Sequence, residues 1–382
     1  MLEKKHRILY VGPIGTHWIH ECVPDGATIS FLPLTRISAR HFYTSTLVFF
    51  FINFIRDFTY LIRHPRALIR FSILDSEKKD MVLSLSDNWP WLQEYGARRS
   101  TPVVLIQNAT RRCLERRKKF RAGLPIYLGW GQLEKDVFDS CGIALEQFQS
   151  VGSLKLGIAY ARYQLTRSQE HHDIVFISQF RPSAGFLDQS AHSDSGDSLI
   201  STNQLKCFAI VKNFAKSHNR KVSIISKTRG PEHYPLEKDY FQDGSDYCDF
   251  SFVKGDKTDG DFDTYDACFG SNLIITMNSS LGFEMLAAGK KVIFCAPGLP
   301  NYIDEIDVRP YFDALPAEVK LASLSLSEFN DKVRAIEACS EVEMHSLIKK
   351  SVRPIINFDR QRLPQTLIKE VLSKHLGFPS LN

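Results

Sequence analysis

The amino-acid sequence predicts an α/β fold made of two doubly wound domains, each built on a parallel β-sheet. The chain has 382 residues, which is more than one hydrophobic core usually organises and fits two domains of ordinary size. Short apolar runs alternate with helix-length segments, as in parallel sheets with crossover helices. These runs form two series that a polar stretch separates, which is why we expect two domains.

The first series of apolar runs begins near the N-terminus. Residues 7–11 (RILYV) end at a turn, residues 12–15, that contains two glycines. A buried parallel strand that leads into such a turn is typical of an open α/β sheet, whose turns face the ligand crevice. We expect the first domain to comprise residues 1–160. Its further predicted strands are residues 81–85, 103–107 and 126–128.

The second series predicts another Rossmann-like domain, residues 173–352. Residues 160–172 are polar and lack a periodic apolar face, so we expect an exposed connection between the domains and a ligand cleft between them. Residues 353–382 are expected to form a C-terminal tail that packs back on the first domain. The predicted strands are residues 173–177, 221–225, 273–276 and 291–295, and the predicted helices include residues 203–217 and 281–288.

Composition narrows the class of protein. Hydrophobic residues make up 43% and charged residues 24% of the chain, as in ordinary globular proteins. The formal charge of +5 is modest, and no nucleic-acid-binding signature accompanies it, so we expect no nucleic-acid partner. Eight cysteines are scattered singly, which argues against a zinc site or a disulfide framework. The N-terminus lacks the pattern of a signal peptide, and we expect a cytoplasmic protein.

Residues 36–72 combine an apolar aromatic core with six arginines. The uninterrupted apolar part, residues 47–55, is about half of the roughly 20 residues that a membrane-spanning helix needs. Two interpretations stay open. A helix that buries its apolar side chains at the lipid boundary would attach the protein to the inner membrane face. Alternatively, the segment is a core helix whose arginines extend to solvent.

A small polar turn followed by a short helix lies near the end of the second series. Residues 277–298 read MNSSLGFEMLAAGKKVIFCAPG. Backbone N–H groups at a helix N-terminus suit a phosphate, and we place Asn278, Ser279 and Ser280 there. Glu284 lies one turn further on, where its carboxylate can accept hydrogen bonds from ribose hydroxyls. The alternative is a plain βα unit with an N-cap serine and a surface glutamate.

This stretch, S-S-L-G-F-E-x-L-x-x-G-K-K-V-I-F, resembles the donor-site motif of GT-B glycosyltransferases, especially bacterial enzymes that build capsule and lipopolysaccharide. Three other segments resemble the same enzymes, although Ala109 replaces the glycine expected after Asn108. The resemblance implies two Rossmann-like domains that face a central cleft, with the acceptor bound mainly by the first domain and the nucleotide sugar by the second. The three segments are SLSDNWPW, VLIQNATRR and VFISQFRPS, which begin at residues 84, 104 and 175.

Further donor-binding candidates follow two strands of the second domain. Ser178, Gln179 and Arg181 come after the strand of residues 173–177, and Lys227 follows a neighbouring strand. A turn at a strand's carboxyl end can reach phosphate, and an arginine there could neutralise the departing nucleotide in place of a metal. An ordinary salt bridge is the alternative for Arg181. No DxD pair follows a first-domain strand, and we expect neither a catalytic metal nor another cofactor.

Inverting transfer needs a carboxylate or histidine near the acceptor hydroxyl. We choose Asp87, which follows the strand of residues 81–85 and so points toward the crevice; capping of the next helix is its alternative role. His17, just after the first glycine turn, is the second choice. The acceptor-binding candidates are Gly15, Asn88, Trp89, Gln107 and Asn108.

Together these features predict a metal-independent glycosyltransferase that acts on a glycan or polyprenyl-linked acceptor in surface polysaccharide assembly. The paired serines also resemble those of enzymes that use CMP-activated ulosonic acids such as Kdo, so such a donor stays open beside UDP-, GDP- and dTDP-sugars. The alternatives are a polyol-phosphate transferase or a sugar-nucleotide epimerase of the same fold, and an inactive scaffold that binds glycan or membrane.

Overall fold

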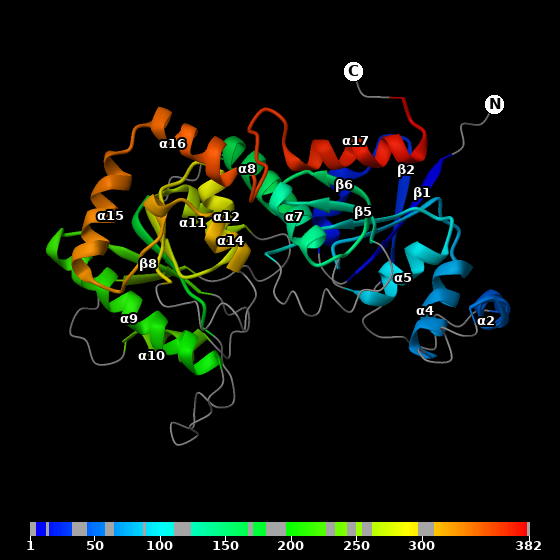
Figure 1. Ribbon diagram of the computed structural model, residues 1–382, viewed down its shortest axis with the longest axis horizontal. Helices are drawn as coiled ribbons and strands as arrows, with labels where there is room; N and C mark the ends of the chain where they lie inside the picture. Colours follow the sequence, from blue (N-terminus) through cyan, green and yellow to red (C-terminus); the bar gives the residue numbers. More distant parts are fainter. Residues whose placement is uncertain are drawn as a thin grey trace.

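The computed structural model has two α/β domains side by side, with both chain termini at the N-terminal domain (Figure 1). The mixed α/β architecture with two parallel sheets confirms the predicted fold class. The structure describes residues 5–12, 15–32, 44–57, 65–86, 89–110, 124–166, 171–180, 196–226, 234–242, 250–253, 262–296 and 309–379.

Within the described residues, the N-terminal sheet has six parallel strands in the order β2-β1-β3-β4-β5-β6. Its inner strands are almost wholly buried and rich in β-branched residues, which favours strands covered by helices on both faces. The strands are β1 (His6–Val11), β2 (Ala27–Leu32), β3 (Met81–Ser84), β4 (Val103–Ile106), β5 (Leu124–Gly129) and β6 (Leu145–Ser150). The helices are α1 (Thr16–Ile19), η1 (His20–Cys22), α2 (Thr44–Arg56), α4 (Pro65–Ser76), α5 (Pro90–Arg98) and α7 (Gln132–Ser140).

In the part of the second domain that the structure describes, the sheet has five parallel strands in the order β11-β10-β7-β8-β9. The strands are β7 (His172–Ile177), β8 (Val222–Ile225), β9 (Phe250–Val253), β10 (Ser271–Thr276) and β11 (Val292–Phe294). The helical segments are α9 (Gly196–Ser217), α10 (Tyr234–Gln242), α11 (Asp263–Phe269), α12 (Ser280–Ala287), α14 (Arg309–Ala314), η3 (Ala317–Val319), α15 (Leu326–Ala338), α16 (Glu341–Leu347) and the π-helical η4 (Ile348–Val352).

The connection between the two sheets differs from the expectation. Residues 160–172 were predicted to be an exposed, aperiodic linker, but residues 160–166 continue α8 (Leu154–Thr166), and His172 already begins β7. The aromatic rings of this helix explain the difference. Tyr160 lies 5.4 Å from the ring of Phe358, and Tyr163 lies 4.8 Å from that of Phe269. The helix therefore packs partly buried tyrosines against the core, which a search for aliphatic periodicity does not detect.

The last helix, α17 (Pro364–Leu376), returns to the N-terminal domain, where it lies along the top of the domain in Figure 1. Lys369 forms an ion pair with Asp25 at 3.0 Å. Just beyond the helix, the ring of Phe378 packs edge-on against His6 at 4.9 Å. The chain thus ends on the domain where it began, and this crossing ties the two domains together.

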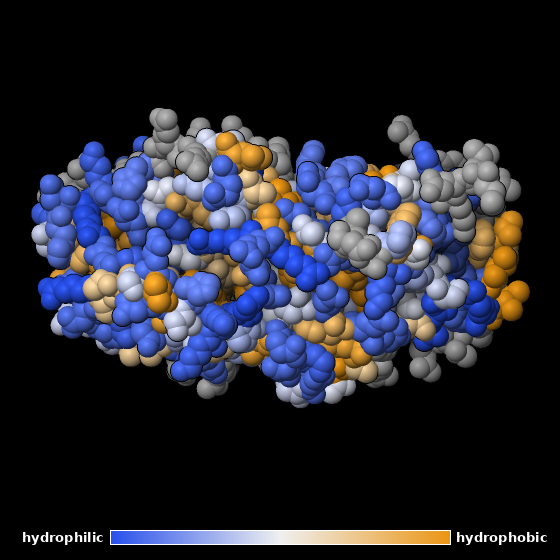
Figure 2. Space-filling view, turned by 90° about the horizontal axis from the view of Figure 1, so that it is seen from above, coloured by the Kyte–Doolittle hydropathy of each residue, from blue (hydrophilic) through white to orange (hydrophobic). Residues whose placement is uncertain are grey.

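Residues 36–72, the segment with the apolar aromatic core and six arginines, include α2 and most of α4. These two helices pack against each other at the outer end of the N-terminal domain. Figure 2 shows apolar side chains gathered at the end of the molecule where α2 lies in Figure 1. Within the residues that the structure describes, no helix is long and apolar enough to cross a membrane.

Candidate functional site

The carboxyl ends of β7 and β10 mark the centre of the second domain. The chain enters this sheet at β7 and then builds β8 and β9 on one side and β10 and β11 on the other. Such a switch point opens a crevice at the carboxyl ends of the two strands. Ile177 pairs in register with Thr276, so the segment after each strand begins at the same edge. Ser178 and Gln179 therefore lie beside Asn278 and Ser279.

The start of α12 is held close to β10. Ser279 is the N-cap residue but makes no side-chain capping hydrogen bond, and its backbone N–H donates to Thr276 Oγ1 at 3.2 Å. Gly282 allows the helix to approach the strand, because a Cβ at this position would lie 2.5 Å from Thr276 Cγ2. The first turn of α12 therefore presents its N-terminus at the crevice, where an anion is favoured.

Glu284 lies on the buried side of α12 and is only 4% exposed. Its carboxylate accepts a hydrogen bond from Tyr265 Oη at 2.7 Å and another from Ser153 Oγ. Tyr265 belongs to α11, while Ser153 immediately precedes α8 and accepts a hydrogen bond from the backbone N–H of Leu156. Glu284 thus joins three helices at the domain boundary. The alternative interpretation, a surface glutamate in a plain βα unit, is wrong because the Glu284 side chain is buried.

Ser280 connects the two domains. Its hydroxyl lies 2.8 Å from Thr110 Oγ1, and it accepts a hydrogen bond from the backbone N–H of Thr110 at 3.3 Å. Thr110 lies four residues beyond β4, at the carboxyl edge of the N-terminal sheet. This contact brings the carboxyl edges of both sheets to the same place.

Gln107 is a second point of contact between the domains, and it is only 1% exposed. Its Nε2 donates to Tyr311 Oη of the C-terminal domain at 3.1 Å and to Glu134 Oε2 at 3.3 Å. Its Oε1 accepts a hydrogen bond from the backbone N–H of Trp130 at 2.7 Å. The side-chain amide therefore has protein partners on both of its ends. The neighbouring Asn108 is half-buried.

On the first domain, Gly15 and His17 follow β1, next to the switch point between β1 and β3. Gly15 precedes α1 with a φ of 77°, and a Cβ there would lie 2.1 Å from Leu85 Cδ1. Because both the backbone angle and the available space require glycine, this position has a structural reason for its residue type. His17 is exposed on α1.

Trp89 is half-buried at the N-cap of α5, with its ring 5.5 Å from that of Trp91.

On the donor side, Ser178 and Gln179 are buried. Ser178 Oγ accepts a hydrogen bond from the Phe180 backbone N–H at 3.1 Å, and the Gln179 backbone N–H donates to Gln204 Oε1 at 2.5 Å. Four predicted site residues lie outside the described residues, namely Asp87, Asn88, Arg181 and Lys227.

Several residues at this boundary were not predicted from the sequence. They are Thr110, Ser153, Tyr265 and Tyr311, whose hydroxyls reach the predicted site residues, and Lys155. The Lys155 ammonium lies 5.1 Å from the ring centre of Trp18 and 5.1 Å from that of Tyr265, so it contacts both domains through cation–π interactions. Thr110 lies within the segment VLIQNATRR, which begins at residue 104, whereas the other four residues belong to no local motif and are brought to the site by the fold.

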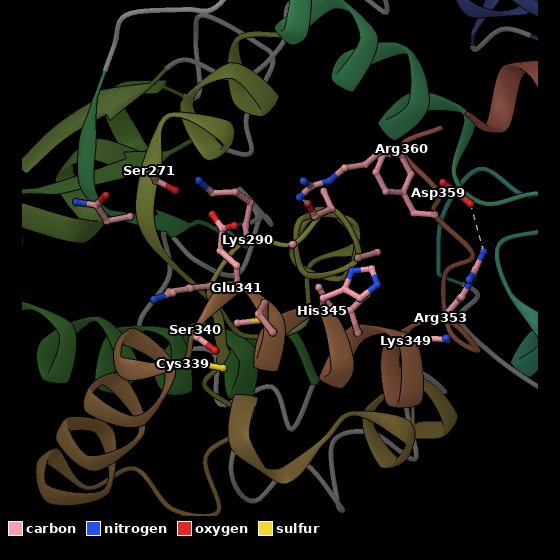
Figure 3. Close-up of a pocket in the computed structure, with 18 of the residues that line it drawn as sticks. Ser271, Lys290, Cys339, Ser340, Glu341, His345, Lys349, Arg353, Asp359 and Arg360 are labelled. Atoms are coloured by element: carbon pink, nitrogen blue, oxygen red, sulfur yellow. Dashed lines mark hydrogen bonds and ion pairs between the residues drawn. The ribbon is translucent and has the colours of Figure 1, made fainter. Parts of the chain in front are cut away.

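A pocket of about 950 Å³ lies at the opposite end of α12 (Figure 3). Its lining comes from the start of β10, the end of α12, α16, η4 and the loop that follows. Arg360 Nη2 donates to the Ala288 carbonyl at 2.8 Å, and Lys290 Nζ donates to the Phe269 carbonyl at 2.9 Å. Cations at a helix C-terminus complement its dipole, so we assign these groups a structural role. None of the predicted site residues that the structure describes lines this pocket.

The structure resembles solved enzymes that share this two-domain fold. UDP-GlcNAc 2-epimerase from Neisseria meningitidis, 10% identical, matches with a TM-score of 0.53 over 97% of this chain and 99% of that one. The Methanocaldococcus jannaschii UDP-GlcNAc 2-epimerase, also 10% identical, has a TM-score of 0.54 over the same shares. The wall teichoic acid polymerase TagF, 11% identical, reaches 0.55 over 98% of this chain and 90% of that one.

Comparison of the sequence with family models gives a match to part of the chain. Residues 142–311 match a family model described as "putative O-antigen biosynthesis protein". No curated protein matched the sequence. The matched residues include Ser153, Tyr265 and the whole of α12, which are central to the site. The chain has the GT-B fold, and its sequence is similar to a family of surface-carbohydrate biosynthesis proteins.

Proposed function

We propose that the protein is a glycosyltransferase that moves a sugar from a nucleotide donor to an acceptor in surface polysaccharide assembly. The observation that carries the proposal is the juxtaposition at Ser280, where the N-terminus of α12 meets the loop after β4. A donor phosphate at the helix N-terminus would there lie beside the first domain, which is where an acceptor must approach. The two epimerase structures described above contain UDP-GlcNAc, and two TagF structures contain CDPG, which supports a nucleotide ligand for this fold.

The donor-binding part of the proposal uses the second domain. Asn278, Ser279 and Ser280 hold the phosphates, with help from the backbone at Ser178 and Gln179. Glu284 accepts hydrogen bonds from the ribose, because each carboxylate oxygen has two lone-pair sites and its present partners occupy part of this capacity. Tyr265 and Ser153 then act as positioning residues that orient the carboxylate.

The chemical step uses groups from both domains. Asp87, or His17 in its place, takes the proton of the acceptor hydroxyl as the acceptor oxygen bonds to the anomeric carbon. The bond from that carbon to the phosphate oxygen breaks, and the electron pair leaves with the nucleotide. Arg181 and Lys227 stabilise the negative charge that develops there. These cations would replace a metal ion, and we propose a metal-independent reaction.

The acceptor is a glycan or a polyprenyl-linked glycan that contacts the first domain. Gly15, Asn88, Trp89 and Asn108 are the proposed contacts, and Trp89 would stack on a sugar ring. Gln107 has a different part in the proposal, since its amide is held by protein groups: it positions the loop that carries Asn108 and Thr110. We place the protein in the cytoplasm, at the inner face of the membrane.

The donor could be a CMP-activated ulosonic acid such as Kdo, or a UDP-, GDP- or dTDP-sugar. Two other reactions fit the similar structures. An epimerase would act on a UDP-sugar without any acceptor, and a polyol-phosphate transferase would consume a CDP-polyol.

Acceptor dependence separates these functions. The purified chain would be incubated with each nucleotide sugar, with and without a polyprenyl-linked glycan, and the released nucleotide measured by chromatography. We expect release only with acceptor, unchanged by EDTA and lost in Asp87→Ala. Epimerised sugar formed without acceptor would instead assign an epimerase, turnover of a CDP-polyol would assign a polyol-phosphate transferase, and failure to bind any nucleotide would assign a scaffold.

A further inference from the structure

Helix α2 has the reverse of the usual arrangement of side chains in a surface helix. An ordinary surface helix buries an apolar stripe and exposes polar residues. In α2 the residues that face the protein include Thr46 and Asn53, both buried, whereas large apolar residues face outward. This arrangement requires both a polar surface for α2 to pack on and an apolar environment for its outer face.

The inner face of α2 is fixed by hydrogen bonds to α4 and α5. Asn53 Nδ2 donates to Asp75 Oδ2 at 2.9 Å, and Asn53 Oδ1 accepts from Arg99 Nη2 at 3.0 Å. The same Arg99 pairs with Asp57 at 2.9 Å, just beyond the end of α2. Thr46 Oγ1 lies 3.3 Å from Ser76 Oγ. Buried polar groups with several partners specify one orientation of a helix, so these contacts hold the apolar face outward.

The outer face is apolar from Leu47 to Ile55. Phe51 is 66% exposed and Ile55 79% exposed. They lie four residues apart, on the same side as Val48. Figure 2 shows the resulting apolar patch at the end of the molecule. The exposed apolar residues of α2 are Leu47, Val48, Phe51, Ile52, Phe54 and Ile55.

The sequence around this helix is rich in positive charge. Between Asp25 and Asp75 the sequence has six arginines and a single acidic residue, Asp57. Asp57 is buried and ion-paired with Arg99, so it presents no negative charge at the surface. Arg56 at the end of α2 is half exposed and pairs with Asp57 at 3.6 Å and with Asp75 at 3.7 Å, and Arg66 at the start of α4 is exposed. Desolvation and the neighbouring charge of Arg66 both lower the pKa of Arg70, which indicates that positive groups are crowded here.

We propose that the outer face of α2 inserts into the interfacial region of an anionic lipid bilayer. The apolar side chains would enter the boundary between headgroups and acyl chains, while the arginines meet the anionic headgroups. A second copy of the chain fits less well. A two-fold interface would place this cationic surface against itself, and a helix about 20 Å long and 10 Å wide covers far less than the roughly 800 Å² per partner of a stable interface.

This proposal rests on the proposed function, because it identifies the surface by which such a transferase would contact the membrane. Its test requires neither donor nor acceptor. Flotation of the full chain would be measured with neutral phosphatidylcholine vesicles and with vesicles that contain phosphatidylglycerol. We expect binding to the anionic vesicles, and a reduction of at least about tenfold in Ile55→Glu and in Phe51→Glu, because each removes one inserted apolar side chain and adds a negative charge.

The matched control is Leu165→Glu. Leu165 is 88% exposed, but it lies on α8, far along the chain from this face, and its variant should bind vesicles like the wild type. Circular dichroism would check that each variant is folded, and Val48→Glu would replace any variant that is not. Equal flotation of the α2 variants and the wild type, or no wild-type binding to anionic vesicles, would overturn the proposal. So would a wild-type dimer in sedimentation that Ile55→Glu converts to a monomer, since the face would then bind a second copy.

Discussion

The hydroxyl of Thr110, after the fourth strand of the first domain, lies 2.8 Å from the hydroxyl of Ser280 at the first residue of α12. This contact, together with the hydrogen bond from the Thr110 backbone N–H to the same oxygen at 3.3 Å, joins the segment that we assign to the acceptor with the helix N-terminus that we assign to the donor phosphate. A phosphate bound at this helix would lie next to Thr110, and both domains would therefore contact the donor.

The Thr110–Ser280 contact predicts different effects for its two partners. Ser280→Ala removes a proposed phosphate ligand and should weaken nucleotide binding about tenfold or more, since hydrogen bonds to charged groups contribute roughly 1.5–3 kcal/mol. Thr110→Val removes only the hydroxyl contact to Ser280, keeps the hydrogen bond from its backbone N–H, and should change nucleotide affinity much less. Isothermal titration calorimetry would measure both affinities. Equal losses in the two variants would indicate that Ser280 acts only by holding the domains together.

Glu284 should matter more for the donor than for the fold. Glu284→Gln keeps the shape of the side chain but replaces one acceptor oxygen by a donor group, so we expect nucleotide affinity to fall about tenfold through a weaker ribose contact. Tyr265→Phe removes one positioning hydrogen bond and should reduce affinity by a smaller factor. Both variants would be compared by calorimetry and by thermal melting. Lower melting temperatures with unchanged affinity would make Glu284 a purely structural residue.

Gly15 offers a test of the packing beneath the predicted acceptor loop. Gly142 is the matched control, because its φ of 68° is similarly left-handed but a Cβ there would meet nothing within 4 Å. Gly142→Ala should cost about 1 kcal/mol from backbone strain alone. Gly15→Ala should lower the melting temperature further, because overpacking against Leu85 adds about 1–3 kcal/mol. Equal melting temperatures would show that the Leu85 side chain moves away without cost.

The packing of α17 on the first domain should depend on pH through His375. Desolvation, followed by the charge of Lys374, lowers the pKa of His375 below its ordinary value of 6.5. The unfolded chain then binds a proton more readily than the folded one, so this residue reduces stability as pH falls below about 6.5. The melting temperature of His375→Gln should therefore fall less than that of the wild type when the pH is lowered from 7.5 to 5.5. An identical loss in both proteins would contradict this assignment.

The sequence predicted the inner strands of both sheets well, because strands buried on both faces read as continuous apolar runs. It did not predict β2 and β6, which lie at the edges of the first sheet and alternate between exposed and half-buried residues. The short β9, at the edge of the second sheet, was also missed. Few positions of β2 and β6 are buried, so their apolar signal is weak.

The candidate site was predictable only where it lies on one segment. Residues 278–284 form a local motif, and its serines and glutamate could be found by spacing along a helix. Thr110, Ser153 and Tyr265 reach the same motif from other parts of the chain, and their positions follow from the sheet order and the packing of α8 and α11. The buried position of Glu284 also depends on these partners, so spacing alone suggested a carboxylate more open to a ligand than the one observed.

Nucleotide binding at α12 is the central claim, and a ligand panel tests it most directly. Thermal melting would be measured with CMP, CDP, UDP, GDP and dTDP, because a ligand that binds only the folded state raises the melting temperature. The account predicts a clear increase with at least one of these nucleotides, and a much smaller increase in Ser280→Ala than in Thr110→Val. No increase with any of them, or an equal increase in both variants, would contradict it.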